Sequence, residues 1–333
     1  MAGARTLAII AGSACAAALA FGLSGYHLFQ LTMVVTYAIA ILGLNIVTGY
    51  NGQISLGHGA FYAIGAYVTA ILISNYDVPY WATLPVSALI CAAFGFAFGL
   101  PALRLGGLYL ALTTFALAVA LPQLLKYPAL EPWTGGVQGI VISKPEAPFG
   151  LKLSADQWLY LFTLAIGAVM FLLAANLLSG RIGRAIRAVR DNPIAAEAMG
   201  VDLALLKTRT FAVSALYTGV AGSLGAIAVQ FVAPDSFSVF LSITLFVGLV
   251  VGGVASISGA IFGAAFIVFV PNLAEQVSKA AAGAVYGVIL IAFLYFIPSG
   301  FAGMARRILQ RMLPQRPAMV VRAEVGAREN GHA

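Results

Sequence analysis

Long apolar runs, separated by short polar segments, follow one another along the chain from its start to about residue 300. Each run is about 20 residues long, the length that an α-helix needs to cross a bilayer. The runs are continuous, whereas the strands of a membrane barrel would alternate apolar and polar residues. They predict an all-α polytopic membrane protein with about ten transmembrane spans. These lie near residues 6–24, 29–49, 53–74, 80–102, 107–126, 157–179, 209–230, 238–255, 257–273 and 281–300.

The composition of the chain indicates that lipid is its solvent. Of its 333 residues, 61% are hydrophobic and 9% are charged, which is more apolar surface than a soluble core can hide. The first apolar run is also compatible with a cleaved signal peptide. Because further runs follow at once and Arg5 can anchor it on the cytoplasmic side, we interpret it as a first span.

Positive charge is concentrated in two segments of the chain. The first holds Arg181, Arg184, Arg187, Arg190, Lys207 and Arg209, and the second, the tail, holds Arg306, Arg307, Arg311, Arg316, Arg322 and Arg328. Because basic segments stay on the cytoplasmic side, both are expected inside, and the four spans predicted between them permit this. The predicted topology is N-in and C-in. The net charge of +7 therefore reflects orientation and is no indication of nucleic-acid binding.

The same reasoning divides the chain into a transmembrane domain, residues 1–303, and a basic tail, residues 304–333. Within the domain, residues 180–208 form a cytoplasmic loop and residues 127–156 a periplasmic loop. The periplasmic loop is long enough to cap a pore or to contact an external partner, although a solvated connector fits its composition equally well. The tail is expected to be mostly disordered beyond a short amphipathic helix.

The chain lacks the sequence features of a transporter that powers itself. A phosphate-binding loop ends in Gly-Lys, and none of the five lysines follows a glycine. An ion-coupled carrier would hold carboxylates inside its spans. The predicted spans of this chain contain almost none, and Glu275 lies near the end of one. Cys15 and Cys91 have no metal-ligand spacing, so we expect no metal and no cofactor. Transport by this chain would have to be powered by another protein, and the chain itself is not expected to be an enzyme.

The cytoplasmic loop contains a short helix with its own start and stop signals. Arg184, Arg187 and Arg190 recur at helical spacing along one side of a helix that leads out of the membrane. Asp191 and Asn192 then supply an N-cap, Pro193 suits the first position of the helix "PIAAEAM", and Gly200 ends it. A small, alanine-rich helix of this kind can lie in a cleft of another protein. The alternative is an ordinary basic loop with one capped turn.

The most polar stretch within the apolar region is "NIVTGYNGQISLGHGAFYAIGAYV", residues 45–68. Irregular, glycine-rich backbone is tolerated in the bilayer only where protein or a water-filled cavity surrounds it, so we predict that this stretch faces a translocation pathway. A helix beginning here would point free N–H groups at a passing carboxylate. The alternative is close helix packing with His58 bonded to a carbonyl across the interface. The candidate pathway residues are Asn45, Asn51, Gln53, Ser55, Gly57, His58 and Phe61.

Two further groups of small residues accompany this stretch. The segment "GGVASISGAIFGAAF", residues 252–266, is weakly similar to residues 49–65, as expected of a transporter built from repeats. Gly219, Gly222 and Gly225 recur every three residues, which favours a role in close helix packing.

Several ordered motifs resemble a known family. The region from 183 to 215 is similar to the cytoplasmic loop of ABC-importer permeases, with Glu197, Ala198 and Gly200 at the positions of its EAA-type motif. Between residues 29 and 304 the chain resembles the M-type permease subunit of branched-chain amino acid ABC importers. The stretches that carry this resemblance are "GYNGQISLGHGAFYAIGAY" (49–67), "LRLGGLYLALTTFALA" (103–118), "TGGVQGI" (134–140), "PDSFSVFLSITLFVGLVVGGVASISGAIFGA" (234–264) and "FIPSGFAGM" (296–304). The motif departs from a literal Glu-Ala-Ala, and Ser299 stands where a basic residue is common.

The resemblance implies a multi-pass permease of the bacterial inner membrane that works with separate partners. These are a second, H-type permease, two cytoplasmic ATPase subunits and a periplasmic binding protein that delivers leucine, isoleucine or valine. It also implies that the short helix couples ATP hydrolysis in the ATPase to alternating access. The coupling candidates are Arg187, Asp191, Asn192, Pro193, Ala196, Glu197, Ala198, Met199 and Gly200.

Two other functions remain compatible with the sequence. One is a related ABC permease for urea or another small polar or carboxylate solute, because substrate choice in such systems depends largely on the binding protein. The other is a stand-alone channel or ion-coupled carrier. The near absence of carboxylates in the spans and the presence of a coupling-type helix both disfavour it.

Overall fold

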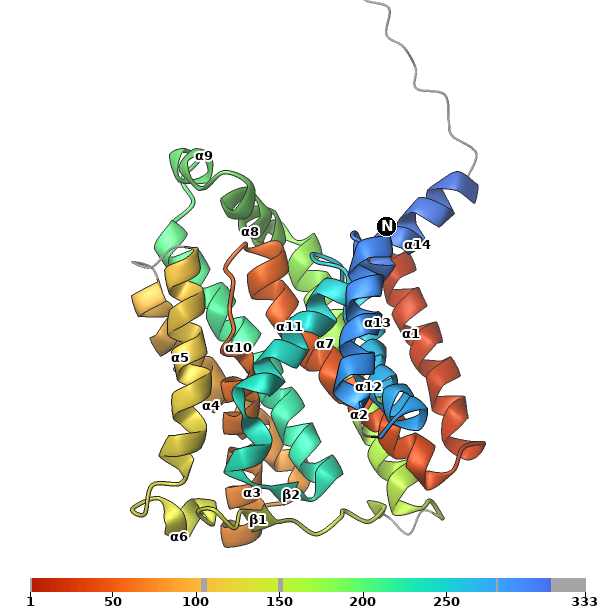
Figure 1. The fold of residues 1–333 in the computed structure, drawn as a ribbon. Helices are drawn as coiled ribbons and strands as arrows, with labels where there is room; N and C mark the ends of the chain where they lie inside the picture. The colour runs from red at the N-terminus through yellow and green to blue at the C-terminus, as the bar shows by residue number, and fades with distance from the viewer. Residues whose placement is uncertain (1, 103–106, 149–151, 280, 313–333) are drawn as a thin grey trace, which may run out of the picture.

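The computed structural model describes residues 2–102, 107–148, 152–279 and 281–312 (Figure 1). The first half contains helices α1 (Ala2–Ala18), α2 (Gly25–Leu44), α3 (His58–Tyr76), α4 (Tyr80–Ala102), α5 (Leu108–Leu125), α6 (Glu131–Thr134) and α7 (Ala155–Ser179). The second half contains α8 (Arg181–Asp191), α9 (Pro193–Ala198), α10 (Leu203–Val229), α11 (Val239–Gly252), α12 (Gly259–Val277), α13 (Ala282–Phe296) and α14 (Gly300–Met312). Shorter elements are the 3-10 helices η1 (Leu19–Phe21) and η4 (Pro234–Phe237), the π-helix η2 (Asn45–Tyr50), and strands β1 (Ile140–Val141) and β2 (Phe231–Val232).

The helices agree with the predicted all-α membrane protein of about ten spans. Within the described residues, nine helical stretches are long and apolar enough to cross a membrane, and Ile9–Phe21 is a shorter apolar helix. Two predicted spans depart most at their start: α10 begins at Leu203, before the expected 209, and the span expected at 53–74 begins late. Its helix, α3, begins at His58 because residues 51–57 form an extended segment.

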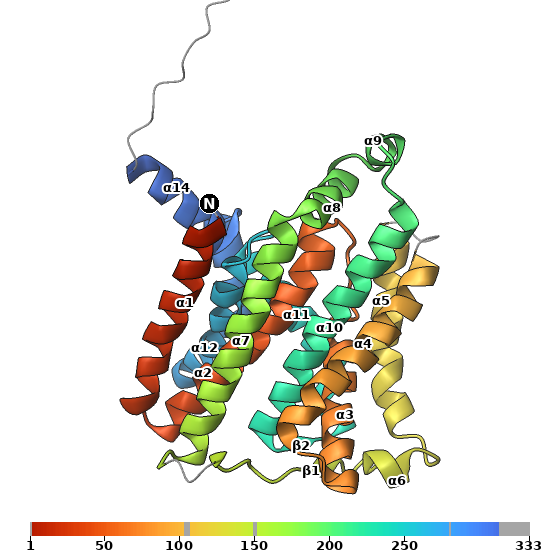
Figure 2. The same cartoon turned by 180° about the vertical axis from the view of Figure 1, so that it is seen from behind.

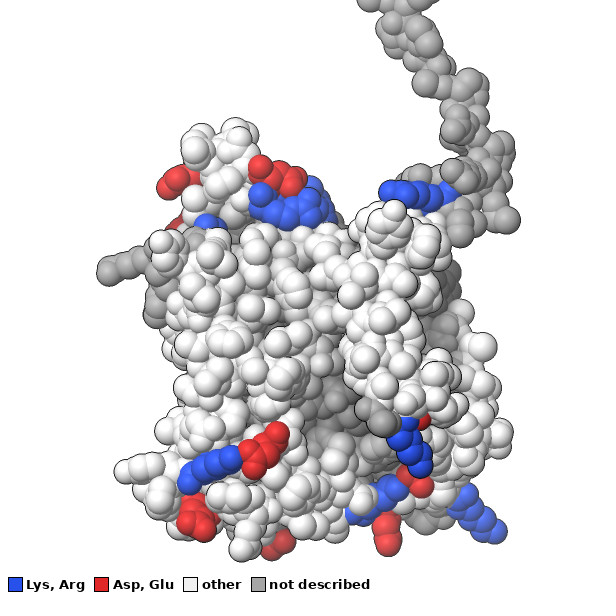
Figure 3. Space-filling model, in the orientation of Figure 1, with Lys and Arg blue, Asp and Glu red and all other residues white. Residues whose placement is uncertain are grey.

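The ends of the molecule agree with the predicted N-in and C-in topology. The N-terminus, α8, α9 and α14 lie at one end of the bundle, and α6, β1 and β2 lie at the other (Figure 1). Charged side chains gather at these two ends, and the visible described surface between them forms a broad uncharged band (Figure 3). Such a band matches the hydrocarbon core of a bilayer. The tail beyond α14, residues 313–333, for which disorder was predicted, lies outside the described residues.

Helices α2 and α10 form the centre of the bundle, and α10 also packs against α3 and α4. The predicted packing role of the α10 glycines is confirmed, because a Cβ at Gly222 would collide with the carbonyl oxygen of Tyr62. A Cβ at Gly219 would collide with Cys91, and one at Gly225 with the Tyr62 hydroxyl. Small residues thus let α10 approach its neighbours closely, as membrane helices require in the absence of a hydrophobic driving force.

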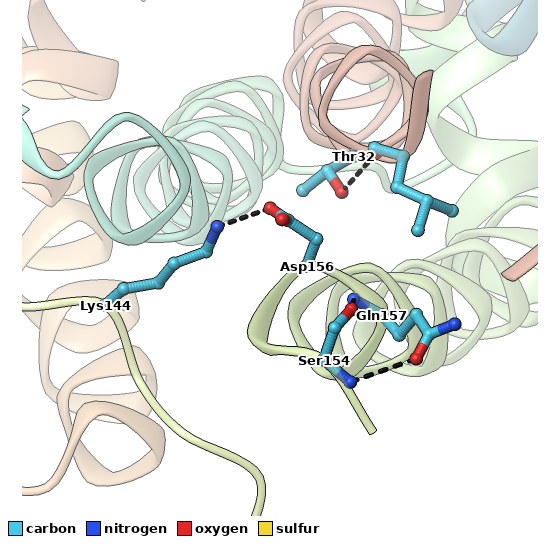
Figure 4. Close-up of polar contacts among 6 residues, drawn as sticks. Thr32, Lys144, Ser154, Asp156 and Gln157 are labelled. Atoms are coloured by element: carbon cyan, nitrogen blue, oxygen red, sulfur yellow. Dashed lines mark hydrogen bonds and ion pairs between the residues drawn. The ribbon is translucent and has the colours of Figure 1, made fainter. Parts of the chain in front are cut away.

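The loop at 127–156 lies across the end of the bundle opposite α9 (Figures 1 and 2). Its strand β1 pairs with β2 in antiparallel register, with Ile140 opposite Val232. Nearer to α7, Lys144 forms an ion pair with Asp156 (Figure 4). Ser154 caps α7 by accepting from the backbone N–H of Gln157, whose side chain in turn accepts from the Ser154 N–H. The loop is therefore attached to the bundle at both of its halves.

Candidate functional site

Helix α9 is the outermost described element at the end of the bundle that carries α8 (Figure 1). It starts as the sequence predicts: the side-chain oxygen of Asn192 accepts from the Ala195 N–H at 3.0 Å, and Pro193 occupies the first helical position. Ala196 is buried, whereas Ile194 and Met199 are 80% and 85% exposed. Two large apolar side chains thus project from a short, individually capped helix, as expected of a surface that a partner covers.

Gly200 ends α9 through its backbone conformation. Its φ of +86° lies in the left-handed region, and a Cβ there would meet no atom within 4 Å, so conformation and not space makes this position favour glycine. The N–H of Gly200 donates to the Glu197 carbonyl at 2.9 Å, and that of Val201 donates to the Ala196 carbonyl at 3.1 Å. The following helix, α10, is capped in turn by Asp202, which accepts from the Leu205 N–H.

A pocket of about 480 Å³ opens where α9 joins α10. Its lining includes two carboxylates and one ammonium group. The lining residues are Glu197, Gly200, Val201, Asp202, Leu203, Ala204 and Lys207. The coupling candidates Glu197 and Gly200 therefore lie together at one concave surface.

Arg187, another coupling candidate, has a contact within the chain. Its Nη1 donates to the carbonyl oxygen of Leu178, near the end of α7, at 3.0 Å. The contact braces the corner between α7 and α8, because the last carbonyls of a helix lack partners within the helix and attract cations. Of the remaining candidates in α9 and its caps, all except the buried Ala196 are exposed.

Sequence reasoning missed the role of Arg190 as a residue linking two segments. Its Nη1 donates at 3.1 Å to the carbonyl oxygen of Gly49, in η2. In the sequence, Arg190 is the last of four arginines spaced three residues apart, and nothing local assigns it a contact with residues 45–57.

The polar stretch that begins at residue 45 passes from helix to extended chain inside the bundle. Helix α2 continues into the π-helix η2, residues 51–57 run inward from the end near α8, and α3 starts at His58 (Figures 1 and 2). A helix begun within this stretch was one form that the sequence suggested. Most of the stretch is buried within the chain, the environment that irregular backbone in a bilayer requires, whereas Gly52 and Ile54 are exposed.

Asn45 joins η2 to the break between α11 and α12. Its side-chain nitrogen donates to the Ser256 carbonyl at 2.8 Å, and its side-chain oxygen accepts from the Ala255 N–H at 2.9 Å. Asn45 is fully buried. The two glycine-rich stretches whose similarity the sequence suggested are therefore in direct contact.

His58 connects three helices through hydrogen bonds. Its Nε2 lies 2.6 Å from the hydroxyl of Ser214, in α10, which itself donates to the Gly43 carbonyl in α2 at 2.6 Å. Because the single hydroxyl proton of Ser214 is committed to Gly43, Nε2 must carry the proton that it shares with Ser214. Nδ1 then accepts from the hydroxyl of Ser55 at 3.0 Å. His58 is thus held as the neutral Nε2–H tautomer.

One N–H group in the first turn of α3 is bonded to a side chain from another helix. The hydroxyl of Ser242, in α11, accepts from the Gly59 N–H at 2.9 Å. Just before the helix, the Thr114 hydroxyl accepts from the Leu56 N–H at 2.9 Å. A Cβ at Gly57 would lie 2.8 Å from the carbonyl oxygen of Thr114, so α5 packs directly on this turn. The Gly59 donor, which could have faced a passing carboxylate, faces a serine in this conformation.

Two amide side chains in the stretch are buried without hydrogen bonds. Asn51 is 3% exposed and Gln53 is 8% exposed. Both polar atoms of the Asn51 amide and the nitrogen of the Gln53 amide find no partner among the described residues. Each buried polar group without a hydrogen bond lowers the stability of the fold by about 1–3 kcal/mol. These amide groups are therefore free to bond to a ligand or to another part of the protein.

The structure brings the seven pathway candidates together in one region, where every one of them is buried within the chain. Phe61 packs edge-on against His58 and Phe211. Ile54, which the sequence did not single out, is 43% exposed and gives the segment an outward-facing side chain. In this conformation Asn45 and His58 bond to other parts of the chain, whereas the Asn51 amide has no partner among the described residues. The role of the candidates in a pathway stays a prediction.

An all-α bundle with a broken helix inside its apolar band and a capped helix projecting beyond it defines the class of protein: a multi-pass membrane transport protein. The family described as branched-chain amino acid transport system / permease component matches residues 26–294. The chain belongs to this family.

Curated relatives are similar over most of their length. The high-affinity branched-chain amino acid transport system permease protein LivM of Salmonella typhimurium is 33% identical over 299 residues, covering 83% of this chain and 69% of the relative. BraD of Pseudomonas aeruginosa, a permease protein of the same kind of system, is 27% identical and covers 84% and 96%. LivH of Salmonella typhimurium is 26% identical and covers 82% and 93%. No solved structure matches the chain.

Proposed function

We propose that the chain is one permease subunit of an ABC importer that carries branched-chain amino acids across the bacterial inner membrane. The observation that carries this proposal is the family match over residues 26–294, and the projecting helix α9 supports it. The greater identity to LivM than to LivH favours the M-type position in a pair of permeases. The chain would work with an H-type permease, two ATPase subunits and a periplasmic binding protein.

In the proposed mechanism, the ATPase subunits bind α9 and move it when they close on ATP. Ile194 and Met199 supply apolar anchors, and Glu197 contributes charge beside the pocket at the start of α10. The displaced helix rocks the bundle between inward-open and outward-open arrangements around the stretch from Asn45 to Phe61. This chain performs no covalent chemistry, because hydrolysis occurs in its partners.

The experiment is uptake of labelled leucine in cells that lack this chain and in cells where it is restored. Uptake is measured before and after ATP depletion at an intact proton gradient, with urea in parallel. Restored leucine uptake that stops on ATP depletion supports the proposal. Uptake of urea alone would change the substrate and keep the architecture, whereas leucine uptake that ignores ATP would overturn the ABC mechanism in favour of a channel or carrier.

Coupling through α9 is tested with Glu197→Lys and Gly200→Pro. The first reverses the charge beside the pocket, and the second removes the N–H that donates to the Glu197 carbonyl and excludes a φ of +86°. Both variants should abolish uptake while the protein remains inserted, as measured by immunoblot of membranes. Glu275→Lys, the same charge reversal on an exposed residue at the end of α12, is the matched control. Normal uptake by both α9 variants would remove the coupling role.

A further inference from the structure

The side chain of Arg190 spans the gap between the coupling region and the membrane-embedded stretch. Its Nη1 donates to the Gly49 carbonyl at 3.1 Å. Its Nε and Nη2 lie 2.9 Å from the same carboxylate oxygen of Asp191, the last residue of α8. One planar guanidinium therefore bonds to both segments at once, which its fork of donors allows and the single ammonium of a lysine does not reproduce.

The stem of Arg190 adds packing to this contact. Gly52 has a φ of +74°, and a Cβ on it would lie 2.9 Å from Cγ of Arg190. The absence of a side chain at Gly52 lets the arginine lie directly against the backbone at the start of the extended segment. Arg190 thus touches that backbone on both sides of the end of η2, at Gly49 and at Gly52.

The backbone at Gly49 is held firmly by its other neighbours. A Cβ at Gly49 would collide with the side-chain oxygen of Asn45 and would lie 2.7 Å from the backbone nitrogen of Ala255. Asn45 in turn bonds to residues 255 and 256 in the break between α11 and α12. A pull on the Gly49 carbonyl therefore acts at a point where two broken segments meet.

The neighbouring arginines of α8 make different contacts. Arg187 donates to Leu178, at the end of α7, and so acts within the corner between α7 and α8. Arg184 is exposed. Of these three arginines, Arg190 is the one whose described hydrogen bonds reach the 45–57 stretch.

The segment in contact with Arg190, residues 49–53, contains buried polar groups that lack hydrogen-bond partners among the described residues. These groups are both polar atoms of the Asn51 amide and the nitrogen of the Gln53 amide. Asn51 and Gln53 lie two and four residues after Gly49. Beyond them the chain leads through Ser55 to His58 and the start of α3. A displacement of residues 49–53 would give the amides new partners and would shift the turn that sets the position of α3.

We propose that Arg190 is the positioning residue that passes the displacement of α8 and α9 to the intramembrane segment 51–57, through its hydrogen bond to the Gly49 carbonyl. The inference rests on the proposed function, because it needs an ATPase that moves α9. The proposed role of Arg190 predicts that loss of the guanidinium uncouples ATP hydrolysis from transport. Hydrolysis and transport must therefore be measured in the same preparation.

The test uses the assembled importer, with all of its partner subunits, reconstituted in proteoliposomes. Arg190→Ala should lower leucine uptake per ATP hydrolysed by about tenfold or more, because a half-buried, charge-assisted hydrogen bond and the packing of the side chain against Gly52 are lost. Arg190→Lys keeps the charge but not the fork and should fall between Arg190→Ala and wild type. Arg184→Ala, on the same helix, is the control and should match wild type.

A second readout follows the movement itself. Ile54→Cys, in a chain with Cys15→Ser and Cys91→Ala, places a thiol on the outward side of the segment, where Ile54 is 43% exposed. Its rate of modification by a maleimide should differ between the nucleotide-free importer and the importer trapped with ADP and vanadate, and Arg190→Ala should abolish the difference. This comparison needs only assembled protein and does not depend on uptake.

The possible results separate the two proposals. Absence of ATP-dependent leucine uptake in the wild-type importer would overturn the proposed function. Normal uptake per ATP in Arg190→Ala, with the nucleotide-dependent thiol reactivity retained, would overturn the role of Arg190 alone. A parallel loss of assembly, hydrolysis and uptake in Arg190→Ala, accompanied by normal coupling in Arg190→Lys, would show that the side chain acts only in folding.

Discussion

The two hydrogen bonds of Asn45 predict that Asn45→Ala destabilises the bundle. The substitution removes the donor to the Ser256 carbonyl and the acceptor of the Ala255 N–H. Both backbone groups belong to the break between α11 and α12, outside any helix, so no intrahelical hydrogen bond can replace the lost partners. Asn45 is fully buried, so water has little access to them.

The expected loss can be worked out from these contacts. An interhelical hydrogen bond in a membrane protein contributes about 0.6 kcal/mol on average and about 1.7 kcal/mol at most. Two such bonds give about 1–3 kcal/mol in the free energy of unfolding. Because the N–H and the carbonyl are both left unpaired in a buried site, we expect the upper part of this range, about 2–3 kcal/mol.

The assay is reversible unfolding of the purified chain in mixed micelles, by titration with sodium dodecyl sulfate and tryptophan fluorescence. Asn75→Ala removes the same side chain at an exposed position near the end of α3 and should change the unfolding free energy by less than about 0.5 kcal/mol. Leucine uptake by both variants is measured in parallel and normalised to the amount of folded protein. An Asn45→Ala chain of unchanged stability whose uptake collapses would refute the structural role and favour the pathway role.

Two other substitutions test the packing of the bundle and the attachment of the loop between α5 and α7. Gly222→Leu should prevent stable folding, because even its Cβ would collide with the Tyr62 carbonyl, whereas Gly283→Leu, where a Cβ meets no atom within 4 Å, should accumulate normally in membranes. Ser154→Ala should lower the unfolding free energy by about 1 kcal/mol through loss of the α7 cap, and Ser154→Asp, which retains an acceptor for the Gln157 N–H, should recover most of that loss in the same titration. Normal abundance of Gly222→Leu would contradict the close packing of α10 against Tyr62. Wild-type stability of Ser154→Ala would contradict the role of Ser154 as the α7 cap.

The spans, their orientation and the start of α9 were predictable because their signals are local. A continuous apolar run, a cluster of arginines, and the sequence Asn192-Pro193 each act within a few residues of their own position. The limits of the span at 53–74 were wrong by several residues, since hydropathy does not register the extended segment at 51–57. An apolar composition shows that a segment is buried in lipid or protein. Whether the segment is helical there depends on its hydrogen-bond partners, which hydropathy does not reveal.

The contacts of the candidate site were not predictable from the sequence. Asn45 is 211 residues from its partner Ser256, His58 is 156 residues from Ser214, and Arg190 is 141 residues from Gly49. No periodic pattern encodes such pairs. Sequence reasoning identified the polar stretch as unusual, but it could not tell a residue that binds another helix from one that lines a pathway.

The long separation between Asn45 and its partners also has a consequence for biosynthesis. At about 5–20 residues per second, the ribosome needs about 10–40 seconds to make the 211 residues between Asn45 and Ser256. For most of that time α2 has been made but α10 has not, and the break that Asn45 binds is made only at the end. The polar groups of the 45–58 stretch must then be shielded by the insertion machinery or by water at the membrane surface. The bundle therefore completes its central contacts late in synthesis, because residues 45–58 bind segments in the second half of the chain.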